Sequence, residues 1–202
     1  MERTISMMVG KGSLNHNNRT FVAKNVDRER SKSNKVYMKE SIKKVYHALF
    51  DEALEAYNAK QTRADRRIDN YYEKIRTSKQ EKLFHELIVQ IGNKNDTNCN
   101  MLESVYAQSA LEEYMMGFQE RNPNLRVFNA VMHLDEETPH LHIDYVPFST
   151  ENKRGLSTKV SLKGALKVQG FVGTGRFDTE WKRWVESEKQ CLAEIMERYQ
   201  ME

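Results

Sequence analysis

The chain of 202 residues lacks the features that mark several classes of protein. It has two cysteines, Cys99 and Cys191, which are far apart and belong to no CxxC pair. A disulfide framework and a thiolate zinc site are therefore not expected, and a reducing cytoplasm fits the chain. No run approaches the roughly 20 apolar residues of a membrane-spanning helix. Residues 1–9 lack the apolar core of a signal peptide.

Phosphate-binding and nucleophilic motifs of several enzyme classes are also missing. The sequence holds no P-loop and no GxGxxG, so a nucleotide cofactor is not expected. No tyrosine precedes Tyr37, which excludes an early nucleophilic tyrosine. The adjacent pair at 71–72 falls on the apolar stripe of a predicted helix, so core packing is the favoured interpretation.

Hydrophobic periodicity predicts an α+β domain that spans residues 1–202. Because the two clearest strands are joined by a short turn, a central antiparallel β-sheet is expected. Helices should cover one face of this sheet and leave the other free for a substrate. Strands are predicted at 4–9, 86–92, 126–134 and 140–148. A charged loop is predicted at 25–35 and a mobile loop or linker at 170–175. Helices are predicted at 39–58, 63–76 and 101–121, within 151–167, and from 178 onward in the C-terminal segment 176–202.

Half of the six histidines lie within residues 133–142, together with three carboxylates. His140 and His142 are two apart on a predicted strand and so project from the same face. His133 ends the preceding strand, and antiparallel pairing can bring it beside the pair. Three imidazoles can then converge, with Glu136 or Asp135 close by in the turn.

Neutral imidazole is the commonest metal ligand in proteins, and three histidines leave open positions on a divalent ion. Ligand softness alone would accept zinc, iron, nickel or manganese. The alternative is that each histidine is satisfied separately by hydrogen bonds. An open metal site can polarise a phosphoryl oxygen or activate water. Phosphoryl chemistry is favoured because basic segments suited to a polyanion occur at 63–74 and 151–167.

These residues also carry a family resemblance. The stretch 133–142 (HLDEETPHLH) resembles the metal motif of MobV relaxases, the Pre/Mob plasmid mobilisation and recombination enzymes of the HUH endonuclease superfamily. Residues 16–19 (HNNR) resemble the HNxR motif of this family, and residues 25–34 resemble its second polar motif. Residues 156–159 are similar to a segment beyond the metal site. The resemblance covers roughly residues 5–170 in the same order.

The resemblance implies a relaxase with a palm-like HUH fold that nicks one DNA strand at a transfer origin, stays attached to the 5′ phosphate and can religate the strand. It implies a histidine nucleophile, His16, and a divalent metal, Mn²⁺ with Mg²⁺ as an alternative. Glu136 would be a further ligand or a partner of the ligands. The implied metal ligands are His133, His140 and His142. From their chemistry, Asn25, Asp27 or Asn34 are expected to orient His16 through hydrogen bonds, and Arg19 and Arg30 suit phosphate contacts. Further DNA contacts are expected at Lys153, Arg154 and Lys159.

The partners implied are single-stranded or hairpin origin DNA and the conjugative coupling protein of a helper element. Relatives of this family are usually longer, so the chain is expected to be the N-terminal part of a cytoplasmic protein that can dimerise through a further C-terminal region. Two other functions stay open: a non-catalytic origin-binding or replication-control protein with a structural metal, and an unrelated three-histidine hydrolase or oxygenase. A covalent protein–DNA adduct separates the relaxase from both.

Overall fold

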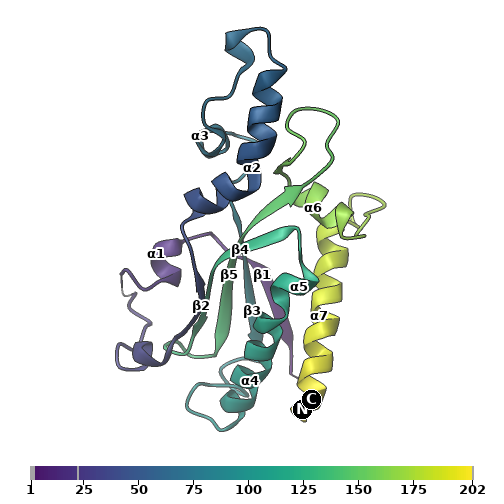
Figure 1. Ribbon diagram of the computed structural model, residues 1–202. Helices are drawn as coiled ribbons and strands as arrows, with labels where there is room; N and C mark the ends of the chain where they lie inside the picture. The colour runs from purple at the N-terminus through teal and green to yellow at the C-terminus, as the bar shows by residue number, and fades with distance from the viewer. Residues whose placement is uncertain (1–2, 22, 202) are drawn as a thin grey trace.

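The computed structural model describes residues 3–21 and 23–201. Helices pack around one antiparallel β-sheet, whose strands follow the order β1-β3-β5-β4-β2, with β6 paired to β5 (Figure 1). This confirms the α+β class and the central antiparallel sheet. The strands are β1 Ile5–Val9, β2 Lys35–Lys39, β3 His85–Ile91, β4 Leu125–His133, β5 His140–Ser149 and β6 Lys159–Val160.

Helices α4 and α7 pack on one face of this sheet (Figure 1). The buried residue Glu188 fastens α7, because its carboxylate accepts hydrogen bonds from the Tyr114 hydroxyl at 2.6 Å and from Asn122 Nδ2 at 3.0 Å. No helix within the described ranges is long and apolar enough to cross a membrane. The helices are α1 Leu14–Asn17, α2 Ile42–Ala59, α3 Tyr71–Arg76, α4 Glu103–Met116, α5 Phe118–Arg121, α6 Leu162–Val168 and α7 Glu180–Arg198.

The other face is not left free, which corrects the expectation from the sequence. The ends of β4 and β5 that are remote from the β4–β5 turn carry Phe128 and Val146 into a second core. There they meet Tyr46 and Phe50 of α2 and Tyr71 of α3. A β-bulge between Val127 and Asn129 inserts Phe128 out of register. Only the end of this face next to the β4–β5 turn is available for a site.

Two predicted elements were wrong in extent. Residues 35–39 form an edge strand against β4, where no strand was predicted and only the end of a charged loop at 35 and the start of a helix at 39 were expected. This strand forms by long-range pairing with β4, which the local pattern did not indicate. The helix predicted at 63–76 is α-helical only over Tyr71–Arg76, because Asn58 bonds both backbone groups of Ile68 and Asn70 caps the helix by accepting from Glu73 N. The final helix ends at Arg198, and residues 1, 2 and 202 lie outside the described residues.

Candidate metal centre and its neighbouring histidine

Three histidines converge at the turn between β4 and β5. The strand register pairs His133 directly with His140, and His142 follows two residues further on the same face. The ring centroids are 5.3 Å apart for His133 and His140, 4.5 Å for His133 and His142, and 5.0 Å for His140 and His142. All three side chains are buried. The hairpin therefore brings together the three imidazoles that the sequence predicted as ligands.

Each of these rings has one nitrogen held by a hydrogen bond. His133 Nε2 donates to the Asn17 carbonyl at 2.8 Å and His140 Nδ1 donates to the Thr138 carbonyl at 2.8 Å. His142 Nδ1 donates to Glu86 Oε1 at 2.6 Å. The opposite nitrogens, His133 Nδ1 and His142 Nε2, are buried without a partner in the part of the chain that the structure describes. One fixed N–H and one free lone pair per ring is the arrangement that metal-ligating histidines adopt.

Burial keeps His133 and His140 neutral. It lowers the pKa of His133 to about 3 and the pKa of His140 to about 4, and in each case the neighbouring His142 adds to the effect. A neutral imidazole offers its lone pair, whereas an imidazolium cannot bind a cation. The donor set therefore fits a divalent metal.

Behind the histidines lies a polar network that sequence reasoning missed. Asn17 is buried and its Nδ2 donates to Glu86 Oε1 at 2.9 Å and to Asp144 Oδ2 at 3.0 Å. Asn129 Nδ2 also donates to Asp144, at 2.8 Å, and burial raises the pKa of Asp144 to about 6. The alternation in β5 could have indicated Asp144, which follows His142 at the same spacing. Glu86 gave no such signal, because only the pairing of β3 with β5 brings it to His142.

His16 comes to this cluster from α1, near the N-terminus. Its ring centroid lies 5.5 Å from that of His142 and 5.7 Å from that of His133. Its Nε2 is 3.7 Å from Glu136 Oε1, and Arg19 Nη1 lies 3.4–3.5 Å from both ring nitrogens. Burial, followed by the charge of Arg19, lowers the pKa of His16 below its ordinary value. The structure thus places a neutral, partly exposed imidazole beside the buried three.

The second polar motif clamps the β4–β5 turn and does not touch His16. Among the described residues, the expected hydrogen bonds to His16 from Asn25, Asp27 or Asn34 are not found. The bonds of this motif to the turn are Asn25 Nδ2 to Glu136 Oε2 at 3.1 Å, Asp27 N to the Asp135 carbonyl at 2.8 Å, Asn34 Nδ2 to Asp135 Oδ2 at 2.7 Å and Arg30 Nη1 to the Glu136 carbonyl at 3.2 Å.

Arg19 joins the same clamp. Its Nε donates to Asp135 at 2.9 Å, and its Nη2 donates to Asp135 at 2.6 Å and to Glu136 at 2.7 Å. Although burial opposes ionisation, the bonds from Arg19, Ser31 and Asn34 hold the pKa of Asp135 well below its usual range. Arg19 was predicted at a phosphate, but two carboxylates occupy most of its donors and leave Nη1 directed at His16.

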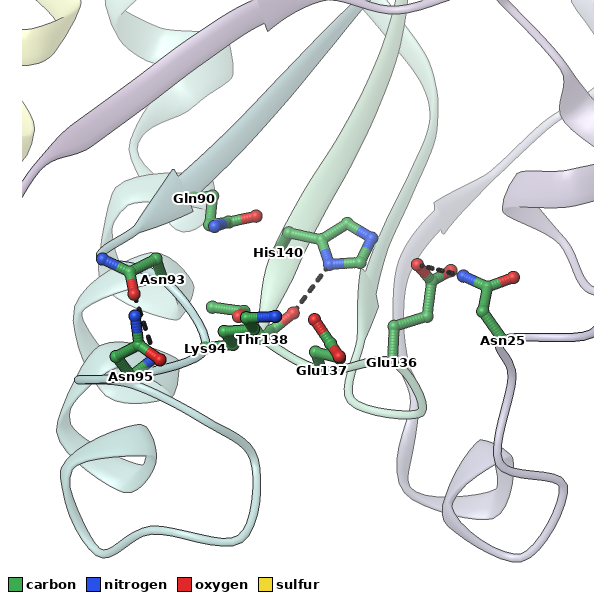
Figure 2. Close-up of a pocket in the computed structure, with 9 residues that line it drawn as sticks. All are labelled: Asn25, Gln90, Asn93, Lys94, Asn95, Glu136, Glu137, Thr138 and His140. Carbon is green, nitrogen blue, oxygen red and sulfur yellow. Dashed lines mark hydrogen bonds between the residues drawn. The ribbon is translucent and has the colours of Figure 1, made fainter.

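An open cleft of about 880 Å³ lies beside His140, between the loop after β3 and the β4–β5 turn (Figure 2). Gln90 Nε2 donates to the Gly92 carbonyl at 2.9 Å, and Figure 2 shows its amide oxygen directed toward His140. Glu136 and Glu137 form the opposite wall. This cleft gives access to the histidines. The predicted DNA contacts Lys153, Arg154 and Lys159 are elsewhere, past the far end of β5, which is a strand of 10 residues or about 30 Å.

Potential ligand atoms lie within 4.8 Å of one another in two groups, His16 with His133 and His142, and His133 with Glu136 and His140. The predicted three-histidine set is thus divided between two groups that share His133. The fold and the site together define an antiparallel-sheet domain with a three-histidine cluster whose donor atoms suit a divalent metal. Within this class, the chain belongs to the plasmid recombination enzyme family (Mob_Pre), which matches residues 16–169. This confirms the family resemblance.

Two solved structures are similar over the whole chain. Both are the MobM relaxase domain (MOBV; Mob_Pre) bound to 22-nucleotide oriT DNA of plasmid pMV158, in Mn-bound crystal structures at pH 5.5 and pH 4.6. They are 21% and 20% identical to this chain, with TM-scores of 0.55 and 0.51. Each covers 100% of this chain, which in turn covers 88% and 89% of theirs. No curated protein matches the chain. At this identity the likeness establishes a shared fold.

Proposed function

We propose that the chain is a metal-dependent relaxase that nicks one strand at the transfer origin of a plasmid or mobile element and can religate it. The observation that carries this proposal is the position of His16, whose ring lies 5.5 Å from His142 and 5.7 Å from His133. A structural metal site would need no partly exposed imidazole beside it. Membership in the plasmid recombination enzyme family and the DNA-bound state of MobM support the same function.

In this proposal His133, His140 and His142 hold the divalent metal, with Glu136 as a further ligand or partner. The unpartnered nitrogens of His133 and His142 support this assignment. When bound, the ion would polarise the scissile phosphate and offset charge on its oxygens. Mn²⁺ is favoured over Mg²⁺ because the similar MobM structures hold Mn.

His16 would be the nucleophile. Its lone pair attacks phosphorus, an N–P bond forms, and the bond from phosphorus to the 3′ oxygen breaks. The electron pair of that bond leaves with the 3′ oxygen, which takes up a proton, and the 5′ phosphate remains on the protein as a phosphoramidate. A neutral imidazole needs no prior deprotonation, unlike a tyrosine with its pKa near 10. Glu136, 3.7 Å from His16 Nε2, is placed to accept the proton that the phosphorylated ring releases.

The charge distribution suggests how DNA approaches. Residues 60–82 hold eight Lys and Arg against four Asp and Glu, and residues 150–168 hold five against one, in a chain with a net charge of only +3. Both segments lie at the same end of the molecule (Figure 1). There Lys74, Arg154 and Lys159 line a groove. We assign this end, with Lys153, to the double-stranded stem of a hairpin origin. The single strand would then run along the sheet to His16.

The test is a covalent adduct on a denaturing gel. The purified chain with Mn²⁺ should nick a supercoiled plasmid that carries the origin and should remain attached to the cut strand. His16→Ala should abolish the adduct, and peptide mapping of the wild-type adduct should locate the link at His16. The matched control is His47→Ala, at an exposed histidine of α2 that pairs with Asp51, and this variant should react as the wild type does. Full adduct yield in His16→Ala would overturn the nucleophile assignment. Origin DNA that binds and is never nicked would favour an origin-binding protein with a structural metal.

A further inference from the structure

Phe21 is an exposed aromatic side chain next to the proposed nucleophile. It is 52% exposed, and its ring centroid lies 6.3 Å from that of His16 with the two planes inclined by 50°. An apolar ring left in solvent contributes little to the core, and a single one needs no explanation. Its position at the site distinguishes it from a scattered surface residue.

The backbone conformation after α1 brings the Phe21 ring to His16. After α1, Arg19 adopts a left-handed conformation with φ 51°, which residues other than glycine rarely adopt. Thr20 then folds back, because its N–H donates to the Asn15 carbonyl at 2.9 Å and its hydroxyl to the same carbonyl at 3.1 Å. This reversal returns Phe21 to the side of His16. Backbone strain of this kind is concentrated at functional sites.

Other exposed aromatic side chains of the described residues lie away from the site. Tyr106, 47% exposed, is on α4, and Phe177, 84% exposed, precedes α7. Both helices pack on the opposite face of the sheet from the histidines. Phe21 therefore has the one location from which an exposed ring can meet a substrate held at His16, and Phe177 provides a natural control.

We propose that Phe21 is the platform on which an unpaired base next to the scissile phosphate stacks. This inference rests on the proposed function and adds a substrate-binding residue to it. A base is one sugar away from its phosphate, so a phosphate within reach of His16 brings a neighbouring base to Phe21. Aromatic side chains bind single-stranded DNA in this way, with little base preference, because every base has a π face.

Binding measured without cleavage tests the platform. In EDTA, a short single-stranded oligonucleotide selected from a random pool on the wild-type protein serves as the probe. Phe21→Ala should lower its affinity roughly 5- to 100-fold, whereas Phe177→Ala should leave it unchanged. Phe21→Trp should retain affinity and Phe21→Leu should not, because leucine keeps apolar contact but cannot stack. The fluorescence of the introduced tryptophan should be quenched on binding.

An abasic scan of the same oligonucleotide locates the stacked base. One abasic position should weaken binding to the wild type and have no further effect on Phe21→Ala, since both changes remove the same contact. Equal affinity of Phe21→Ala and wild type, equal affinity of the Leu and Trp variants, or a pool that yields no binder would overturn the proposal. If Phe21→Ala loses affinity as expected but the wild type forms no adduct on any DNA, the relaxase chemistry is refuted and the platform is not. If Phe21→Ala keeps the wild-type affinity and forms the adduct normally, the platform alone is refuted.

Discussion

The two faces of β5 are equally buried and yet entirely different in chemistry. Leu141, Ile143 and Tyr145 point toward α4 and α7 and are all 0% exposed. His140, His142 and Asp144 alternate with them, point the other way and are at most 8% exposed. Burial alone therefore does not separate the core from the site in this protein.

Hydrogen-bond satisfaction separates the two faces more clearly, although the Tyr145 hydroxyl on the apolar face is also buried without a partner among the described residues. Buried polar atoms in native proteins almost always have partners. On the histidine face, five buried side-chain atoms of the described residues have none: His133 Nδ1, His142 Nε2, Asn17 Oδ1, Asn129 Oδ1 and Asp144 Oδ1. Such a concentration is expected where a ligand supplies the missing partners. The comparison teaches that one strand can stabilise the fold with one set of side chains and present polar groups suited to a cation with the next.

The largest effect should come from removing a ligand on the polar face. His140→Ala should weaken Mn²⁺ binding by at least about 100-fold and abolish the adduct, because loss of a ligand exceeds the loss of an outer partner. Titration calorimetry with Mn²⁺ measures the affinity. The apolar core should stay packed, since His140 lies outside it, and His47→Ala should bind metal as the wild type does. An unchanged affinity in His140→Ala would remove His140 from the metal site.

The apolar face should show the converse behaviour. Leu141→Ala should lower the free energy of unfolding by about 2–5 kcal/mol, because it opens a cavity in a packed core. The melting temperature should fall by roughly 5–15 °C, while Mn²⁺ affinity measured well below melting stays the same. Val36→Ala, at a position that is 59% exposed on the edge strand, is the control and should change stability by less than about 0.5 kcal/mol. Loss of metal affinity in Leu141→Ala would show that the two faces are coupled.

A histidine on the apolar face sharpens the contrast. His85 stacks on Tyr145 with ring centroids 6.1 Å apart, and burial lowers its pKa to about 4. Because the folded-state pKa is below the unfolded value, the neutral ring's contribution is complete above about pH 6.5 and is lost as the pH falls toward 4. Over this pH window, the free energy of unfolding of His85→Phe should therefore fall by on the order of 2 kcal/mol less than that of the wild type. Urea unfolding of both proteins at pH 7 and pH 4.5 measures this difference. An equal loss of stability in the two proteins would show that the lowered pKa of His85 does not cause the pH dependence.

The smallest effect concerns the outer partner of His142. Glu86→Gln should weaken Mn²⁺ binding by about tenfold, because an amide can still accept from His142 Nδ1 but no longer raises the basicity of the ring through its charge. Glu40→Gln, which breaks an ion pair with Arg126 outside the histidine cluster, is the control and should leave Mn²⁺ affinity unchanged. Equal Mn²⁺ affinities in the two variants would mean that the charge of Glu86 does not contribute to metal binding.

Patterns local in sequence determined much of this protein. The two-residue spacing of His140 and His142, the turn that returns the chain from His133, and the apolar stripes of α2, α4 and α7 follow from backbone geometry and could be predicted directly. The same reasoning failed at residues 35–39, where pairing with β4 forms a strand that the local pattern did not indicate, and at residues 63–70, where Asn58 holds the chain out of a helix.

Tertiary structure alone decided which distant groups complete the site. The order of the strands brings Glu86 to His142, and the path of the N-terminal segment lays Asn17, His16 and Phe21 against the hairpin. The role of Arg19 also changed, from a predicted phosphate contact to a clamp on Asp135 and Glu136. The physical reason is that alternation fixes which side of a strand a residue occupies, but only long-range pairing fixes what it meets there.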